Sequence, residues 1–476
     1  MGSIHFFVNK KLYKVKIIEM EVFIINKREG IFSSRYRALT IGIILAVMAV
    51  AFEGLSVTTI APVIAKSLRG MELYGWIFSA YLLAQILGTM IVGQQIDRSG
   101  PAFPFIFALF IFSIGLIIAA VTQSMLVLII ARALQGFGAG AILTCVYTSI
   151  SLSYPDELRT KILAVFSSAY VLPALIGPYV AGIIAQYSSW RFVFWVIIPF
   201  IILAAFLSLP SFKGLKVKGV QNEGRRQTNL WAIQLTIGTG LLLSGLGMMP
   251  KFFGVILGIV GLILMIIPLR RFLPSGTFVA CSGLPAMLAS RGLFMACYTG
   301  TQSFLVLALT EVKGYASDTA GLIVASAALS WSTAAYIQAR LDERDKGQGR
   351  RMRVLIGVFM MCVGIGVIVW VPIIGITLAV ASQIIIGFGI GLAHPTSGAI
   401  SFAQATEGTE GEVSASLQFV DSFTPGIVVG IGGALITISH TVGIAPYLGI
   451  SAALGIQLIL ILISLLAAYQ LPHIKK

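Results

Sequence analysis

Long apolar runs constrain the fold of this 476-residue chain more than any other feature of its sequence. A helix of about 20 residues crosses a hydrocarbon core of about 30 Å, so an apolar run of that length predicts a membrane span. Fourteen such runs follow one another, which predicts fourteen spanning helices. Their expected limits are 40–64, 73–95, 103–122, 126–150, 161–186, 190–210, 229–249, 252–270, 284–310, 319–339, 353–372, 374–402, 412–438 and 444–470.

The membrane also limits the secondary structure that these runs can adopt. Because no backbone group can stay unpaired in lipid, a spanning segment is either a helix or a strand of a closed barrel. Barrel strands alternate apolar and polar residues, whereas these runs are continuously apolar. Charged residues make up 11% of the chain, against about a quarter in soluble proteins. We therefore predict an all-α, polytopic membrane protein.

The placement of basic residues predicts the orientation of the chain. With fourteen spans and both termini in the cytoplasm, 26 of the 33 Lys and Arg residues lie on the cytoplasmic side, five lie outside and two lie within helices. Such a bias is the positive-inside rule. The net charge of +15 then reflects orientation and contact with anionic lipids at the cytoplasmic face, and no nucleic-acid partner is expected. We expect a multi-pass monomer in the cell (cytoplasmic) membrane.

The N-terminal segment and the cysteines indicate neither processing nor a metal site. The first apolar run begins near residue 40, behind a long basic segment, and lacks the cleavage pattern of a signal peptide. Met1 and Met20 are both possible starts. The four cysteines show no disulfide or metal-ligand spacing, so we expect them to be small packing residues.

Polar segments divide the runs into two groups. The longest polar segment after the N-terminus follows the sixth run, and "QGFGAGA" at 135–141 recurs as "IGFGIGL" at 386–392. Both copies fall in the fourth helix of a six-helix group, and parallel halves of this kind are a transporter architecture with the substrate site between them. Chance recurrence of small-residue runs is the alternative. The expected parts are a basic cytoplasmic segment at 1–39, a six-helix bundle at 40–210, a cytoplasmic loop at 211–228, an extra helix pair at 229–270, a second six-helix bundle at 284–470 and a cytoplasmic tail at 471–476.

The stretch "ARALQGFGAGAI", residues 131–142, places an arginine and three glycines inside one apolar run. A phosphate-binding loop would need a preceding strand and solvated amides, so this function is not expected. Gly136, Gly138 and Gly140 are instead predicted to let helices pack closely. Arg132 costs at least about 2.5 kcal/mol to place in hydrocarbon, which predicts that it faces an aqueous cavity and has an anionic partner.

Only two of the 18 Asp and Glu residues lie well inside predicted helices, namely Glu53 and Asp421. The expected depth of Glu53 is compatible with pairing to Arg132. Burial and a nearby arginine shift the pKa of a carboxyl group in opposite directions, so such a group can gain and lose protons as its access changes. This behaviour is what coupling to a proton gradient requires. The alternative for each carboxylate is a purely structural hydrogen bond between helices.

Three further features are candidates for coupling or movement. Arg291 lies about two turns from the cytoplasmic end of its helix, and it either serves the site or extends to the membrane surface. His394 is either a proton relay or a hydrogen-bonded histidine beside a helix break at Pro395. Gly177 and Pro178 are expected to kink the fifth helix and to act as a hinge.

With these motifs assembled, the chain resembles the major facilitator superfamily over residues 37 to 470, in particular its fourteen-helix drug:proton antiporters. The order of the motifs carries the resemblance. "GQQIDRSGP" is similar to the loop 2–3 signature G-x-x-x-D-R-x-G, "RALQGFGAG" to the helix-4 motif R-x-x-Q-G-x-G-x-G, and "GPYVAG" in part to the helix-5 motif G-P-x-x-G-G. The matching residues are Gly93, Asp97, Arg98, Gly100, Arg132, Gln135, Gly136, Gly138, Gly140, Gly177, Pro178 and Gly182.

The resemblance implies a major facilitator fold, with two six-helix bundles plus an extra central helix pair. It implies that Asp97 and Arg98 form a conformational latch through a charge relay and a helix-dipole contact, and that Arg132 takes part in proton transfer. Glu53 resembles the acidic helix-1 site of the drug exporters. The chain departs from the pattern after Gly100, where Pro101 replaces the usual basic residues. Some fourteen-helix members resemble lipid or glycolipid exporters instead.

We therefore expect a secondary transporter that works by alternating access, as a proton-coupled exporter of an amphipathic or cationic organic solute. Glu53 and Asp421 are the expected proton or substrate carboxylates, with Arg132 and Gln135 beside them. The expected partners are a small-molecule substrate and protons, and the proton gradient takes the place of a cofactor. No enzymatic, ATP-driven or metal chemistry is indicated. The alternatives are a lipid or glycolipid exporter, a nutrient facilitator or importer of the same fold, and a non-transporting receptor or scaffold.

Overall fold

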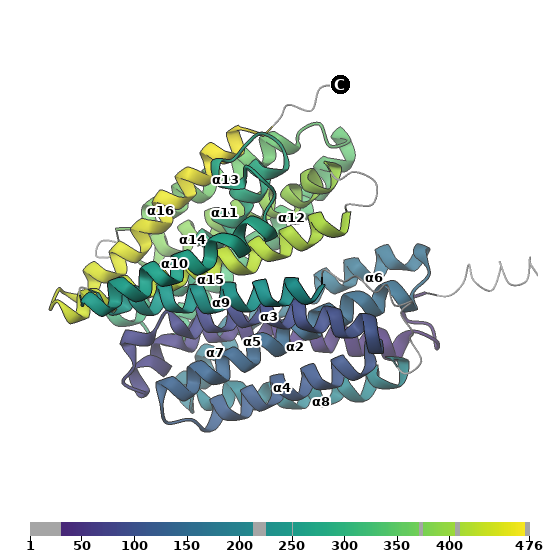
Figure 1. Ribbon diagram of the computed structural model, residues 1–476, viewed down its shortest axis with the longest axis horizontal. Coiled ribbons are helices and arrows are strands. Elements are labelled where there is room, and N and C mark those ends of the chain that lie inside the picture. Colours follow the sequence, from purple (N-terminus) through teal and green to yellow (C-terminus); the bar gives the residue numbers. More distant parts are fainter. Residues whose placement is uncertain (1–29, 213–224, 250, 371–374, 405–409, 472–476) are drawn as a thin grey trace, which may run out of the picture.

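The computed structural model describes residues 30–212, 225–249, 251–370, 375–404 and 410–471. Within these ranges the regular structure is helical, and thirteen helices are long and apolar enough to cross a membrane. Figure 1 shows two helical lobes stacked along their length. The predicted all-α, polytopic fold is confirmed.

Helix limits lie close to the predicted ones in most of the chain. The N lobe contains α2 (Arg37–Ser67), α3 (Trp76–Ser99), α4 (Ala102–Val121), α5 (Met125–Ser153), α6 (Asp156–Ser168), α7 (Val171–Tyr187) and α8 (Arg191–Phe212), with a 3₁₀ turn at Met71–Leu73. The extra pair consists of α9 (Arg225–Gly247) and α10 (Phe252–Phe272), which a 3₁₀ turn at Thr277–Val279 follows. The C lobe contains α11 (Leu284–Leu307) with a π-helical continuation at Ala308–Val312, α12 (Ser317–Asp345), α13 (Arg350–Ile368), α14 (Ile376–Ala403), α15 (Glu410–Thr441) and α16 (Pro446–Tyr469).

One predicted span, 161–186, is wrong as a continuous helix. The structure divides it into α6 and α7, and Ala169 and Tyr170 form a turn between them. Pro173 explains the interruption, because a proline has no N–H to donate and its ring clashes with the carbonyl group four residues earlier, here that of Ala169. In contrast, α7 continues through Pro178. The fifth span is therefore interrupted before the proline that the sequence pattern singled out.

Alternate glycines bring the fourth helix of each lobe against its neighbours. A Cβ atom at Gly136 of α5 would overlap the Tyr81 carbonyl group of α3, and one at Gly138 would lie 2.7 Å from Phe112 Cβ of α4. The same order of contacts recurs in the C lobe, so the sequence repeat extends to the packing. The further contacts of this kind are Gly140 with Gln85 of α3, Gly387 with Ala327 of α12, Gly389 with Gly357 of α13, and Gly391 with Trp331 of α12.

The two lobes join at one end of the molecule. We call this the distal end, and the end where α2 begins and α16 ends the terminal end. The Tyr74 hydroxyl donates to the Ser303 carbonyl oxygen at 2.7 Å, and Ser79 Oγ donates to that of Gly426 at 2.8 Å. Figure 1 shows the lobes converging at the distal end and diverging towards the terminal end, where α6 lies. Further distal contacts join Thr437 Oγ1 to the Glu72 carbonyl oxygen, Gly75 to Gly433, and Lys66 to Glu311.

The extra helix pair lies along the junction of the two lobes (Figure 1). Helix α9 packs against α3 of the N lobe and α15 of the C lobe, where Leu243 meets Gly430. Helix α10 packs on α9 through small residues, since a Cβ atom at Gly238 would lie 3.0 Å from the Gly261 carbonyl oxygen. The pair therefore contacts both lobes along one side of the junction.

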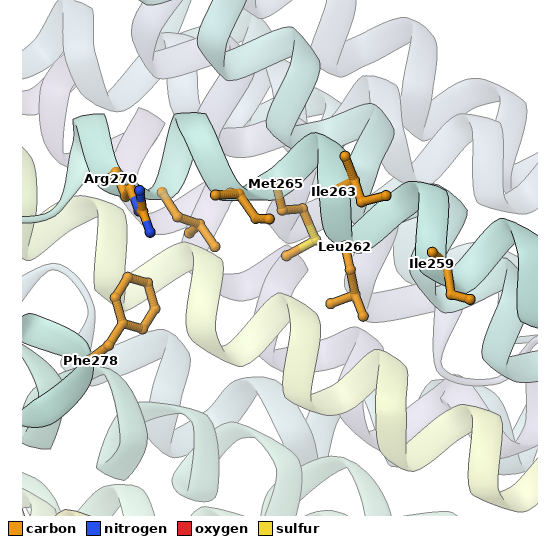
Figure 2. Close-up of a pocket in the computed structure, with 8 residues that line it drawn as sticks. Ile259, Leu262, Ile263, Met265, Arg270 and Phe278 are labelled. Carbon is orange, nitrogen blue, oxygen red and sulfur yellow. The ribbon is translucent and has the colours of Figure 1, made fainter.

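A groove of about 540 Å³ lies on the outer face of α10. Figure 2 shows aliphatic side chains of α10 along the groove, with Phe278 and Arg270 at one end. Phe278 is 70% exposed, and Leu262, Ile263 and Ile266 of α10 are 52%, 59% and 48% exposed. A large exposed apolar surface of this kind marks a membrane contact, so the groove belongs to the lipid-facing surface of the pair. Its lining residues are Ile259, Leu262, Ile263, Met265, Ile266, Leu269, Arg270 and Phe278.

Candidate transport site

Glu53 of α2 and Arg132 of α5 form a buried ion pair inside the N lobe. The Glu53 side chain is fully buried, and 2% of the Arg132 side chain is exposed. Arg132 Nη1 donates to Glu53 Oε1 and also, at 2.7 Å, to Gln135 Oε1. Arg132 Nε donates to the Ile77 carbonyl oxygen at 2.9 Å. The structure thus brings together three of the residues that the sequence marked for coupling.

Helix spacing and close packing position these groups. Arg132 and Gln135 are three residues apart, so they lie on the same face of α5. Gly136 has no side chain, and α3 therefore approaches closely enough for the Tyr81 ring to face the guanidinium, 4.4 Å from its centroid. Gln135 Nε2 in turn donates to the Gly115 carbonyl oxygen of α4 at 3.1 Å. The Arg132 guanidinium therefore contacts Glu53 of α2, Ile77 of α3 and Gln135 of its own helix.

One carboxylate oxygen of Glu53 has no hydrogen bond. Oε2 is buried and makes no hydrogen bond of normal geometry with the described residues, although the Tyr81 side chain is a hydrogen-bonding neighbour of the carboxyl group. A buried acceptor without a partner costs free energy. Protonation converts a carboxylate oxygen into a donor. The geometry can therefore accept a proton at Oε2 while Oε1 stays in contact with Arg132.

A second ion pair lies in the C lobe, where Arg291 of α11 contacts Asp421 of α15. The pair is bidentate, with Nε donating to Oδ1 at 2.8 Å and Nη2 donating to Oδ2 at 2.6 Å. Arg291 Nη1 also donates to Ser397 Oγ at 2.7 Å, and Nη2 lies 2.7 Å from His394 Nε2. Bidentate pairs are geometrically specific and strong, so the guanidinium ties α14 and α15 to α11.

The alternative in which Arg291 extends to the membrane surface is wrong, because its side chain is 7% exposed and contacts Asp421. Sequence reasoning missed this pair. A signal was present in the helix lengths. Arg291 lies seven residues into α11 and Asp421 eleven residues into α15, which corresponds to depths of roughly 10 and 16 Å from the terminal end.

Glu53, Arg132 and Gln135 form the N-lobe cluster, and Arg291, His394, Ser397 and Asp421 form the C-lobe cluster. The two clusters differ in how far their side chains are exposed. In the C lobe, 24% of the Asp421 side chain and 28% of the His394 side chain are exposed. In the N lobe, Glu53 is fully enclosed. In this conformation the C-lobe cluster is partly exposed, whereas the N-lobe cluster is enclosed.

Helix α14 has no break beside His394, so the predicted break at Pro395 is wrong. Thr396 Oγ1 donates to the Leu392 carbonyl oxygen at 2.6 Å, and Ser397 Oγ donates to that of His394 at 2.7 Å. Hydroxyl side chains that bond carbonyl groups near a proline are one way in which spanning helices tolerate that residue. The continuous helix therefore positions His394 next to the ion pair of Arg291 and Asp421.

The residues of the loop 2–3 signature lie at the terminal end of α3. Gly93, Asp97 and Arg98 belong to the last two turns of the helix, and Arg98 is exposed. Gly100 ends the helix with φ of 75°, a conformation that favours glycine. The side chain of Asp97 lies outside the described residues, so the expected charge relay stays a prediction.

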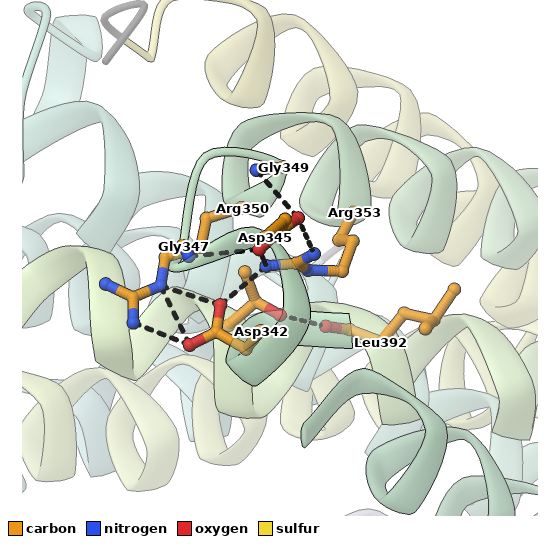
Figure 3. Close-up of polar contacts among 8 residues, drawn as sticks. Asp342, Asp345, Gly347, Gly349, Arg350, Arg353 and Leu392 are labelled. Atoms are coloured by element: carbon orange, nitrogen blue, oxygen red, sulfur yellow. Dashed lines mark hydrogen bonds and ion pairs between the residues drawn. The ribbon is translucent and has the colours of Figure 1, made fainter. Parts of the chain in front are cut away.

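The corresponding turn of the C lobe, between α12 and α13, contains a charge cluster that the sequence reasoning missed (Figure 3). Asp342 accepts from Arg350 Nη2 at 2.6 Å and from Arg353 Nη2 at 2.5 Å. Asp345 accepts from Arg353 Nη1 at 2.6 Å and from the backbone amide of Gly349 at 3.0 Å. The signal was the pattern "DERDKGQGRRMR". Asp342 and Asp345 are three residues apart before the glycine turn, and Arg350 and Arg353 are three residues apart after it.

The helix-5 motif lies where α7 meets the C lobe. The Gly177 carbonyl oxygen accepts from Ser56 Oγ of α2 at 3.4 Å. A Cβ atom at Gly182 would lie 2.6 Å from the Ser317 carbonyl oxygen of α12, and Pro178 approaches the same helix one turn further on. The motif thus provides a close contact between the lobes in their distal half.

Comparison with curated proteins places efflux pumps among the relatives of this chain. Multidrug efflux pump SdrM of Staphylococcus aureus (strain N315) is 25% identical over 364 residues, which cover 74% of this chain and 75% of that protein. Multidrug transporter protein MdtP of Bacillus subtilis (strain 168) is 26% identical over 389 residues, which cover 77% of this chain and 69% of that protein.

Solved transporter structures share the fold. A peptide transporter POT in complex with sulfate is 16% identical, with a TM-score of 0.67, and the match covers 93% of this chain and 96% of that one. The nucleoside transporter NupG is 12% identical, with a TM-score of 0.62. At these identities the likeness concerns the fold alone.

The family described as Major Facilitator Superfamily matches residues 39–429. This range includes the N lobe, the extra pair and most of the C lobe. The chain therefore belongs to the Major Facilitator Superfamily and is a multi-pass membrane transporter rather than an enzyme.

Proposed function

We propose that this transporter exports an amphipathic or cationic organic solute in exchange for protons, by alternating access between its two lobes. Its similarity to multidrug efflux pumps supports export. The observation that carries the proposal is the buried pair of Glu53 and Arg132, with one carboxylate oxygen unpaired. Ionisable groups inside a membrane are costly, and they mark ion and substrate pathways.

The charge distribution supports a cytoplasmic terminal end. Most of the Lys and Arg residues that the structure describes belong to segments at that end, as the positive-inside rule requires of cytoplasmic segments. The distal end, where the lobes are joined, then faces the outside. In this orientation the described conformation takes up solute from the cytoplasm, and parting of the distal contacts releases it outside.

Competition for Glu53 would couple the two fluxes. A proton that arrives from outside binds Oε2 and removes the negative charge that balances Arg132. The guanidinium then loses its ionic partner, which weakens the contacts of α5 with α2 and allows the lobes to move to the conformation open to the cytoplasm, where the ion pair re-forms when the proton leaves. A bound cationic or amphipathic solute favours the ionised carboxylate, so the proton leaves inwards. The solute then moves outwards as the lobes exchange.

Transport by purified protein in proteoliposomes tests this proposal. With an acidic lumen, the wild type is expected to accumulate a cationic dye such as ethidium, and Glu53→Gln is expected to lose at least about 90% of the pH-driven rate because it cannot exchange a proton. The matched control is Glu343→Gln, which removes an exposed carboxylate at the terminal end of α12. Unchanged pH-driven accumulation by Glu53→Gln would disprove the coupling role.

The same vesicles separate the proposal from its alternatives. A nutrient facilitator would equilibrate its solute without releasing protons. A lipid exporter would move a fluorescent phospholipid between leaflets and would not move ethidium. Solute-induced acidification of a weakly buffered detergent solution is expected only for the antiporter.

A further inference from the structure

The facing surfaces of α11 and α14 carry a continuous polar and aromatic strip. Arg291, Tyr298 and Gln302 lie on one face of α11, because they are seven and four residues apart. Gln383 and His394 are likewise eleven residues apart on α14. The helices run in opposite directions, so the two ends of the strip correspond. Arg291 Nη2 lies 2.7 Å from His394 Nε2, and Gln302 Nε2 donates to Gln383 Oε1 at 2.8 Å.

Aromatic rings fill the space between the two polar ends. The rings of Tyr298 and Trp331 meet edge to face, with centroids 5.1 Å apart. Trp331 also packs edge-on against the His394 ring at 5.6 Å. All three side chains are partly exposed. Eleven residues of helix correspond to about 16 Å, so the strip is long enough for an aromatic solute with a polar substituent at each end.

The glutamine pair at the distal end of the strip has unused hydrogen-bonding capacity. Gln302 is 5% exposed and Gln383 is fully buried, yet Gln302 Oε1 and Gln383 Nε2 have no hydrogen-bond partner among the described residues. Tyr298 also interacts with Gln302. Exchanging oxygen and nitrogen in both amides keeps the bond between them and still leaves one donor and one acceptor free. Buried polar groups are normally satisfied, so this pair needs a partner.

The contacts of the N lobe show when such a partner could enter. Ser303, next to Gln302, accepts the distal hydrogen bond from Tyr74, and the Tyr74 ring packs on Phe304. The glutamine pair is therefore closed off while the distal end is joined. The other end of the strip stays partly exposed in the same conformation. A solute on the strip would contact the exposed end first and the glutamine pair last.

We propose that this strip recognises an aromatic solute that carries a neutral hydrogen-bonding group, such as an amide. This inference rests on the proposed export function and specifies a substrate class for it. The ring system packs against Tyr298 and Trp331, and the neutral group donates to and accepts from Gln302 and Gln383. Asp421 neutralises Arg291, so the strip carries no net charge and does not require a cationic solute.

Binding to the purified full-length protein tests the proposal with two probes. Chloramphenicol is a neutral aromatic amide, whereas tetraphenylphosphonium is an aromatic cation without hydrogen-bonding groups. Gln302→Leu and Gln383→Leu are each expected to weaken chloramphenicol binding about tenfold, because one hydrogen bond to a buried group is lost. Tetraphenylphosphonium binding is expected to change less than about twofold, which also shows that the variants are folded.

A third glutamine supplies the matched control. Gln457 of α16 is fully buried and has an unpartnered Oε1, but it packs on Gly300, away from the strip. Gln457→Leu is expected to bind both probes as the wild type does. The proposal is overturned if the wild type does not bind chloramphenicol, if the strip variants weaken both probes equally, or if Gln457→Leu matches them. Failure of pH-driven export with this binding pattern intact would refute the antiport proposal alone.

Discussion

At the residue scale, each lobe neutralises one intramembrane arginine with one carboxylate. Breaking a buried pair leaves an uncompensated charge, at a cost of about 3–5 kcal/mol, whereas removing both members is far less costly. Glu53 and Arg132 are the more enclosed pair. Their environment is therefore the one in which an unpaired charge is least tolerated.

The pair of Glu53 and Arg132 makes a testable stability prediction. Glu53→Gln and Arg132→Gln are each expected to lower the Tm of the detergent-solubilised protein by several degrees, because each leaves one buried charge unbalanced. The double variant is expected to recover most of that loss. Thermal unfolding followed by tryptophan fluorescence measures all three. Additive losses in the double variant would show that the two side chains do not stabilise each other.

A second residue prediction concerns the cluster at the α12–α13 turn. Asp342 accepts from two arginines, and its side chain is 21% exposed. Because charged pairs near the surface are screened by salt, Asp342→Asn is expected to lower Tm by about 1–3 °C at low ionic strength and by less in 1 M salt. Glu343→Asn, on the exposed side of the same turn, is the control. An equal effect of both variants would contradict the role of the cluster.

The residue pairs were only partly predictable from sequence. Compatible depths in the first and fourth predicted spans pointed to Glu53 and Arg132 as partners. Arg291 and Asp421 have similar depths too, yet their pairing depends on how α11 and α15 are rotated about their axes. Hydropathy does not encode that rotation. The contacts of Gln302 with Gln383 and Tyr298 could not be predicted from the sequence for the same reason.

At the element scale, glycine contacts determine how closely helices approach. A Cβ atom at Gly136 would overlap backbone atoms, whereas one at Gly366 of α13 would meet only Leu458 Cδ1, at 3.9 Å. Gly136→Ala is therefore expected to destabilise the protein by about 1–3 kcal/mol. Gly366→Ala is expected to be neutral or to stabilise by up to about 1 kcal/mol, since alanine favours helix. Comparing the Tm values of both variants checks this, and equal values would contradict the packing argument.

Element boundaries followed the apolar runs because membrane thickness selects helix length. The exception was the fifth span, which is interrupted before Pro173. A hydropathy average does not reflect that this proline lacks an N–H and that its ring clashes with the preceding turn. The break predicted at Pro395 had the opposite cause, since neighbouring hydroxyl groups compensate for that proline. Both errors arise from local hydrogen bonding, which a residue-type rule does not capture.

At the scale of the whole molecule, the distal contacts set the balance between conformations. Tyr74→Phe removes one cross-lobe hydrogen bond and keeps the ring. A bond worth about 1 kcal/mol shifts the ratio of distally closed to distally open molecules about fivefold. Spin labels at Arg69 and Lys313, on opposite lobes, would report this shift as a larger population of long distances. Tyr447→Phe, at a partly exposed ring of α16, is the control. An unchanged distance distribution for Tyr74→Phe would contradict the role of that bond.

The two-lobe architecture could be inferred from the recurring glycine motif and the central polar segment. The closed end could not, because it depends on a small free-energy difference between two arrangements of the same lobes. Contacts such as that of Gly182 with Ser317 bring together residues far apart in sequence. No local pattern predicts such a contact.

Three described hydrogen bonds across the distal end share a chemical asymmetry, since each runs from a hydroxyl side chain to a main-chain carbonyl. A carbonyl is present whatever side chain occupies the position, so the accepting positions can change identity without losing the bond. A donor position cannot. Under selection for altered export, substitutions that retune the resting state should therefore accumulate at the donors. The donors are Tyr74, Ser79 and Thr437, and the acceptors are Ser303, Gly426 and Glu72.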